Sequence, residues 1–238
     1  MGMRLLRFLV GLALVPCAVA VTKTLVSVLT TAGSATDEML PLPMLAFGGG
    51  FILWMLIFLA MPQTARSYVL AHELTHALWA KLFGKKVLGM RVGAESGAVT
   101  VSGTNMWITL APYFFPLYSV LAVAVYCLVG LFTDVEPWHT PWLALVGFSW
   151  AFHVTFTLST LMTHQSDIHS YGWLFSYTFI YLMNVITVTI WTVSVSEVTF
   201  AQAGEFLGHD MVVVWAGICH GLTQTVQTVH EFVREATQ

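Results

Sequence analysis

The chain has 238 residues and a formal net charge of −3; 57% of its residues are hydrophobic and only 9% are charged. Soluble domains carry about 25% charged residues, so this composition excludes an ordinary soluble enzyme, a disordered chain and a secreted disulfide scaffold. No long basic run is present, so nucleic-acid binding is not expected. The sequence predicts an all-α membrane protein, a polytopic helical bundle of about six transmembrane helices.

The N-terminal part of the chain predicts two spans, because a span requires about 20 mostly apolar residues and the runs 5–29 and 44–61 provide them. The small residues at 18–20 resemble a signal-peptidase site, but the apolar run continues beyond them. We therefore expect an uncleaved helix, with a cleaved signal peptide as the alternative. The glycine run 48–50 would allow another helix to approach the second span closely, or would serve helix packing alone.

A helix predicted over residues 65–83 ends at Gly84, and the following segment 87–102 has a different pattern of apolar residues. Apolar residues alternate with others along it, and residues 93–97 have the composition of a turn, so a short β-hairpin is expected. Its strand edges cannot lie unpaired in lipid, which places the hairpin at the interface or inside protein.

Three further spans are predicted over residues 107–132, 142–162 and 171–193. Pro112 and Pro116 lie early in the first of these and should bend it or make its start irregular.

The predicted last helix, residues 210–235, has apolar residues at spacings of three and four: Ile218, Leu222, Val226, Val229 and Val233. Such a stripe is typical of a helix that lies on the bilayer, packs against a partner protein, or packs on its own bundle. We favour packing on its own bundle. The chain shows no internal repeat and no linker, so one membrane domain over residues 1–238 is expected.

The strongest chemical signal is an HExxH motif, formed by His72, Glu73 and His76 within the helix 65–83. Positions i and i+4 of a helix face the same way, so both imidazoles can reach one Zn²⁺ ion. Glu73 lies beside them and can act as general base on a water molecule that the zinc activates. Ionisable groups in a membrane helix are costly and indicate function. The structural alternative is two buried histidines held by hydrogen bonds.

A hydrolytic zinc site usually has three protein ligands, so a third must come from elsewhere. The segment 163–169, between two late spans, contains Asp167 together with His164 and His169. Asp167 is the best candidate because the late spans offer no competing carboxylate; a solvated loop acid is the alternative. His164 and His169 are rival ligands. His153, in the middle of a span, is expected to be a packed helix histidine rather than a ligand or a transition-state hydrogen-bond donor.

The chain resembles the site-2-protease-like intramembrane zinc metallopeptidases, and most closely the compact membrane branch without a PDZ domain. The resemblance covers roughly residues 65–175. It rests on the HELTH motif with the following ALWAKLFGKKV, on the hairpin 92–103, on Ala111-Pro112, and on Ser166-Asp167 some 90 residues after the motif. It implies that His72, His76 and Asp167 bind Zn²⁺ and that Glu73 is the catalytic base.

The resemblance also implies the activity, a zinc metalloendopeptidase that hydrolyses peptide bonds of membrane-associated substrates. The hairpin would help to hold an extended substrate, or would simply cover the site. The alternative function is a non-catalytic membrane scaffold or complex subunit that keeps a zinc-binding fold of this kind; a zinc transporter ranks third. Expected partners are membrane lipid, a membrane-protein or peptide substrate, and a protein partner at the C-terminal helix.

Four basic residues in the segment 81–91 follow the motif helix, and the positive-inside rule places them in the cytoplasm. Arg4 and Arg7 would favour the cytoplasm too, yet both groups cannot be inside if the first three predicted helices all span. The conflict would be resolved if the first segment were cleaved, if the second segment were re-entrant, or if the N-terminus lay outside the cytoplasm. We place the chain in the cytoplasmic membrane with the denser cluster, 81–91, on the cytoplasmic side.

Overall fold

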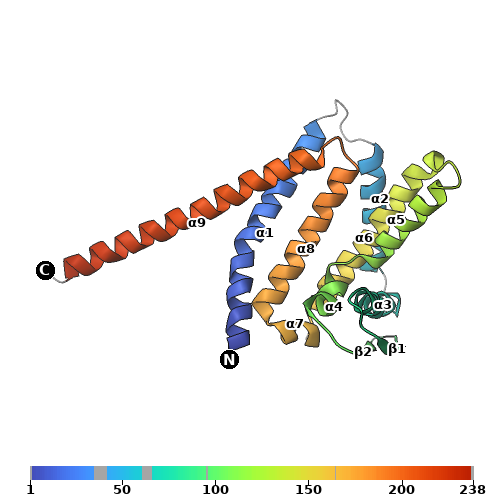
Figure 1. The fold of residues 1–238 in the computed structure, drawn as a ribbon. Coiled ribbons are helices and arrows are strands. Elements are labelled where there is room, and N and C mark those ends of the chain that lie inside the picture. The colour runs from blue at the N-terminus through green and yellow to red at the C-terminus, as the bar shows by residue number, and fades with distance from the viewer. Residues whose placement is uncertain (1, 35–41, 61–65, 95, 164, 237–238) are drawn as a thin grey trace. The chain divides into compact units, whose positions relative to one another are not determined.

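The computed structural model describes residues 2–34, 42–60, 66–94, 96–163 and 165–236. The chain forms two compact units, Met1–Ala35 with Tyr181–Gln238 (unit 1) and Thr36–Ile180 (unit 2). Helices make up most of both units, and the described residues form one small antiparallel sheet, in unit 2 (Figure 1). The prediction of an all-α chain with a short hairpin is therefore confirmed.

Four helical segments among the described residues are long and apolar enough to cross a membrane. They are α1 (Gly2–Ser34), α2 (Leu42–Ala60), the 3-10 helix η2 (Glu136–Trp138) with α6 (His139–Leu161), and α8 (Trp173–Ser194). A fifth span results if α4 (Met106–Leu110), the 3-10 helix η1 (Ala111–Tyr113) and α5 (Leu117–Gly130) form one broken span. The motif helix α3 (Arg66–Leu82) has only 17 residues, so the count of about six spans stays a prediction.

The irregularity predicted at the two prolines is a sharp bend. Helical segments on either side of residues 114–116 are inclined by 86° to one another. Proline lacks an amide N–H and its ring clashes with the preceding turn, so a straight helix cannot continue through Pro112 and Pro116. The Asn105 side chain caps the start of α4 by accepting the Ile108 N–H at 2.9 Å. Both α4 and η1 contact α3, which brings the bent segment to the motif helix.

Helices α2 and α6 approach each other through reciprocal glycines in unit 2. A Cβ atom at Gly50 would collide with the backbone carbonyl of Ala144, and one at Gly147 would collide with the carbonyl of Phe47. The other two glycines of the run 48–50 would meet nothing. Of the three glycines in this run, only Gly50 therefore allows α6 to approach α2 as closely as predicted.

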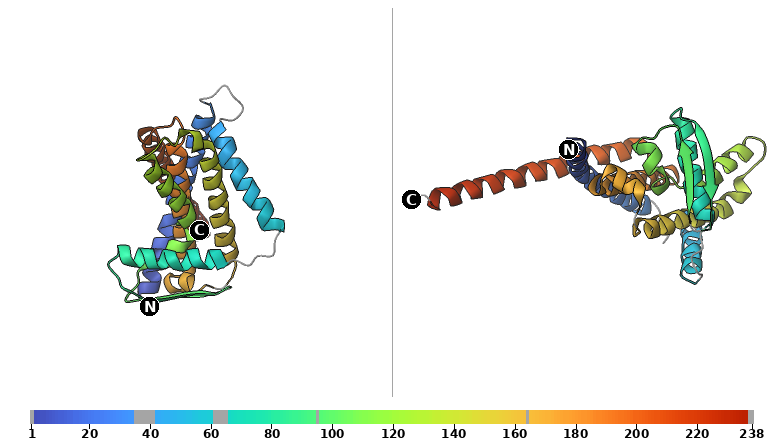
Figure 2. Two further views of the ribbon diagram at one scale, coloured as in Figure 1. Left: turned by 90° about the vertical axis from the view of Figure 1, so that its right-hand side faces the viewer. Right: turned by 90° about the horizontal axis from the view of Figure 1, so that it is seen from below.

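The end of α3 and the hairpin that follows agree with the prediction. Gly84 has a φ of +67°, and the amides of residues 84–85 bond to the carbonyls of residues 80–81 at 2.8–2.9 Å, a Schellman closure that favours glycine. Strands β1 (Val87–Val92) and β2 (Gly97–Val101) then pair antiparallel. Both strands contact α3, and Figure 2 shows the hairpin running alongside that helix.

Unit 1 contains α1, most of α8 and the long helix α9 (Phe200–Ala236). α1 packs against α9. Asp210 on α9 is buried there; it accepts a hydrogen bond from the Thr24 hydroxyl at 3.1 Å and lies 3.8 Å from the Lys23 ammonium. A buried carboxylate is costly unless it is paired, and these two partners satisfy that requirement.

The prediction that the last helix packs its apolar stripe, residues 218–233, on its own bundle is wrong. The helix begins at Phe200, and the stripe is exposed, from 37% at Ile218 to 67% at Val226. A helix of 37 residues is about 55 Å long. Because α9 crosses α1 rather than following it, its C-terminal part extends beyond the contact (Figure 1).

Candidate metal centre

The motif helix brings two histidine nitrogens face to face. The Nε2 atoms of His72 and His76 are 3.2 Å apart. Nδ1 of His76 lies 2.8 Å from the Ile108 carbonyl, and Nδ1 of His72 lies 3.5 Å from the Tyr68 hydroxyl. A proton on each Nδ1 would leave both Nε2 lone pairs available to one ion, which is how metal-binding histidines are usually oriented.

Asp167 joins the histidines from a distant part of the sequence. It lies in the short helix α7 (Ser166–Tyr171) between α6 and α8. Its Oδ2 atom is 3.4 Å from Nε2 of His76 and 3.7 Å from Nε2 of His72. Burial would raise the pKa of the Asp167 carboxyl, but when the histidines carry a proton on Nε2 instead of binding an ion, they donate hydrogen bonds to Asp167 and hold that pKa well below its usual value. The group is therefore an anion at neutral pH, the form that binds metals.

The three atoms fit a single tetrahedral ion. Their separations are 3.2, 3.4 and 3.7 Å, whereas ligand atoms at about 2.0–2.1 Å from a tetrahedral Zn²⁺ lie about 3.3–3.4 Å apart. Across the described residues, His72, His76 and Asp167 are the one such group of histidine, cysteine or acidic side chains. If these three residues bound Zn²⁺, a fourth position would stay open, as in catalytic rather than structural zinc sites.

Glu73 is held beside this group by the hairpin. Its side chain is only 7% exposed. A Cβ atom at Gly97 would come within 2.6 Å of Glu73 Cγ and 2.7 Å of its Oε1. Only a glycine allows the β2 backbone to lie this close to the carboxylate. By composition Gly97 belongs to the turn predicted over residues 93–97, and no spacing rule connects a turn glycine with an acid on another element.

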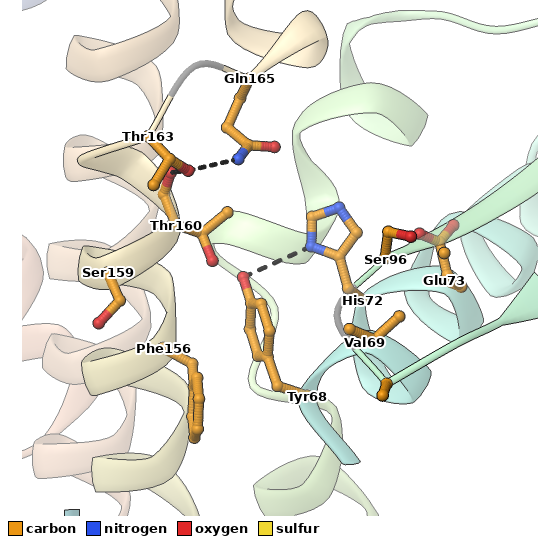
Figure 3. A pocket seen from close by; sticks show the side chains of 12 residues that line it. Tyr68, Val69, His72, Glu73, Ser96, Phe156, Ser159, Thr160, Thr163 and Gln165 are labelled. Carbon is orange, nitrogen blue, oxygen red and sulfur yellow. Dashed lines mark hydrogen bonds between the residues drawn. The ribbon is translucent and has the colours of Figure 1, made fainter. Parts of the chain in front are cut away.

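Two cavities of about 420 Å³ each adjoin the motif. The first lies between α3 and the C-terminal part of α6, where the Thr160 hydroxyl faces Tyr68 and the Thr163 hydroxyl accepts a hydrogen bond from the Gln165 amide at 2.8 Å (Figure 3). The second contains Asp167 and is bounded by residues of β2 and α4. Both are lined by His72, Glu73, Gly97 and Gln165. The candidate metal centre thus has room for water beside it.

Tyr113 contacts two of the candidate ligands, although the sequence analysis did not single it out. Its side chain is 0% exposed. Its hydroxyl donates a hydrogen bond to Asp167 Oδ2 at 3.2 Å, and its ring lies edge-to-face on His72 with centroids 5.3 Å apart. No sequence pattern indicates this role, since Tyr113 follows a proline in a bent segment and belongs to no motif.

The other histidines considered do not join the group. His169 is also on α7, but its side chain is exposed and it is not among the three residues that share the site. His153 is buried in α6, where it packs near Thr75 and His72 around a narrow gap of about 10 Å³. His164 lies outside the described residues.

Comparisons of the chain with protein-family models, with curated proteins and with solved structures found no match. The chemistry of the site alone therefore indicates a function, above all the three converging side-chain atoms of His72, His76 and Asp167 and the buried Glu73 next to them.

Proposed function

We propose that the chain is an intramembrane zinc metalloprotease of the site-2-protease-like kind, which hydrolyses peptide bonds of membrane-associated substrates. The observation that carries the proposal is the convergence of His72 Nε2, His76 Nε2 and Asp167 Oδ2 at 3.2–3.7 Å, beside Glu73. Helices long and apolar enough to span a membrane support a location in the bilayer.

Each residue has a distinct part in the proposed reaction. Zn²⁺ bound by His72, His76 and Asp167 would polarise the substrate carbonyl and make a water molecule more acidic. Glu73 accepts the proton of the attacking water and then donates it to the leaving amine. The anionic Asp167 balances part of the positive charge of the ion. The two cavities admit water and hold the peptide on the open side.

The proposed orientation has α3 and the bent α4–α5 segment within the bilayer, for about six spans in all, with the segment 81–91 in the cytoplasm. A Lys86→Cys variant, in a background without the native cysteines, tests it because Lys86 is exposed. We expect an impermeant thiol reagent to label this cysteine only in inside-out vesicles. Labelling from the outside of intact cells would reverse the orientation.

A non-catalytic scaffold or complex subunit is the second candidate function, and the exposed stripe of α9 is the observation that favours it. Val226 and Val229 are 67% and 57% exposed, so this face is open to a protein partner or to lipid. Such a subunit would bind zinc without hydrolysing peptides.

The test of the proposed function is cleavage of a membrane-helix substrate by the purified protein in detergent or liposomes. We expect cleavage that a zinc chelator stops and added Zn²⁺ restores. A preparation that contains stoichiometric zinc yet cleaves none of a panel of membrane-helix substrates would favour the scaffold. Cleavage unaffected by chelation would contradict the role of the metal.

A further inference from the structure

We propose that Tyr113 is a positioning residue of the candidate metal centre, whose hydroxyl holds the Asp167 carboxylate and whose ring holds the His72 imidazole. This inference rests on the proposed function, because it concerns how tightly the same three ligands bind Zn²⁺. It assigns Tyr113 no contact with substrate.

The hydroxyl of Tyr113 reaches the carboxylate oxygen that faces both histidines. It lies 3.2 Å from Asp167 Oδ2, the same atom that is 3.4 Å from His76 Nε2 and 3.7 Å from His72 Nε2. A carboxylate oxygen has two lone pairs, so it can accept the phenolic hydrogen bond with one and bind an ion with the other. The hydrogen bond thereby fixes the rotation of a carboxylate that a short helix alone would leave free.

The ring of Tyr113 restrains the second ligand. It stands at 88° to the His72 imidazole, with centroids 5.3 Å apart, which is a favourable edge-to-face arrangement. Tyr113 is fully buried and ends η1, where the amides of Phe114 and Phe115 both bond to the Ala111 carbonyl. The ring therefore has little freedom to turn away from His72.

Tyr113 completes a pattern in which every candidate ligand has an outer partner. The Ile108 carbonyl orients His76, the Tyr68 hydroxyl faces His72, and the Tyr113 hydroxyl orients Asp167. Partners of this kind set ligand orientation, and losing one commonly reduces metal affinity about 10–100-fold.

The experiment compares zinc affinity in wild type, Tyr113→Phe and Tyr118→Phe, each measured on the full chain by competition with a chelator. Tyr113→Phe keeps the ring and removes only the hydroxyl. Tyr118→Phe is the matched control, because it likewise removes a tyrosine hydroxyl that donates a hydrogen bond, here to the Ser67 carbonyl of α3 at 2.7 Å rather than to a candidate ligand. We expect a loss of about 10–100-fold in Tyr113→Phe and no more than about a twofold change in the control.

A second readout separates positioning from folding. The Co²⁺-loaded Tyr113→Phe variant should show altered d–d absorption bands, while its helix content and its elution from a sizing column match wild type. Unchanged affinity and an unchanged cobalt spectrum would overturn the inference and leave the proposed function intact. Zinc loss accompanied by loss of folding would overturn it too, by giving Tyr113 a structural role. A wild type without zinc would instead refute the proposed function itself.

Discussion

Glu73→Gln should abolish peptide hydrolysis and leave the zinc content unchanged. Glutamine preserves the size and shape of the side chain, which is buried against the β2 backbone at Gly97, but it cannot accept a proton from water. Loss of a general base commonly reduces the rate about 10²–10⁴-fold. The measurement is initial cleavage rate at saturating substrate, with zinc determined on the same preparation.

Glu205→Gln provides the control for this variant, because it makes the same chemical change at an exposed position of α9. We expect it to cleave at the wild-type rate. If Glu73→Gln kept a rate within about twofold of wild type, another group would be the base and the role given to Glu73 would be wrong.

Asp167→Ala should lose zinc affinity and activity together, whereas His169→Ala should keep most of both. The two residues lie in the same short helix, α7, so similar local perturbations are expected. Only Asp167 places an atom within 3.7 Å of both histidine nitrogens. Removing a ligand should cost more than the roughly 10–100-fold that loss of an outer partner costs. Chelator competition on the purified variants measures the affinities.

His164→Ala belongs in the same series, because the sequence makes His164 a rival ligand. We expect it to keep zinc. Suppose that His164→Ala or His169→Ala binds zinc weakly while Asp167→Ala binds it normally. That histidine, and not Asp167, would then be the third ligand, and the assignment of His72 and His76 on α3 would stand.

The elements with local signals could be predicted from the sequence. The motif helix ends before Gly84, whose left-handed conformation closes it, and the bend occurs where Pro112 and Pro116 interrupt the helical hydrogen bonds. The hairpin follows from alternating residues around a turn. His72, Glu73 and His76 were identified because i, i+4 spacing alone brings the two imidazoles together, and Asp167 because it is the lone acid between two late spans.

Features that depend on tertiary contacts could not be predicted. Tyr113 reaches the site through the bend and Gly97 through the hairpin. No fixed spacing in the sequence therefore indicates that Tyr113 contacts Asp167 or that Gly97 lies against Glu73. The exposed stripe of α9 has the same periodicity as a packed one, and periodicity does not reveal that the helix extends past α1. The single-domain organisation stays a prediction for the same reason, since it depends on contacts between distant segments.

The most direct measurement of the central claim is the zinc content of the purified full-length chain, determined by elemental analysis in wild type and in the His72→Ala/His76→Ala double variant. We expect one zinc ion per chain in the wild type and a strong loss in the double variant, with the helix content of both proteins alike. Zinc that is undiminished in the double variant, or absent from a folded wild type supplied with Zn²⁺, would show that His72 and His76 do not bind this metal.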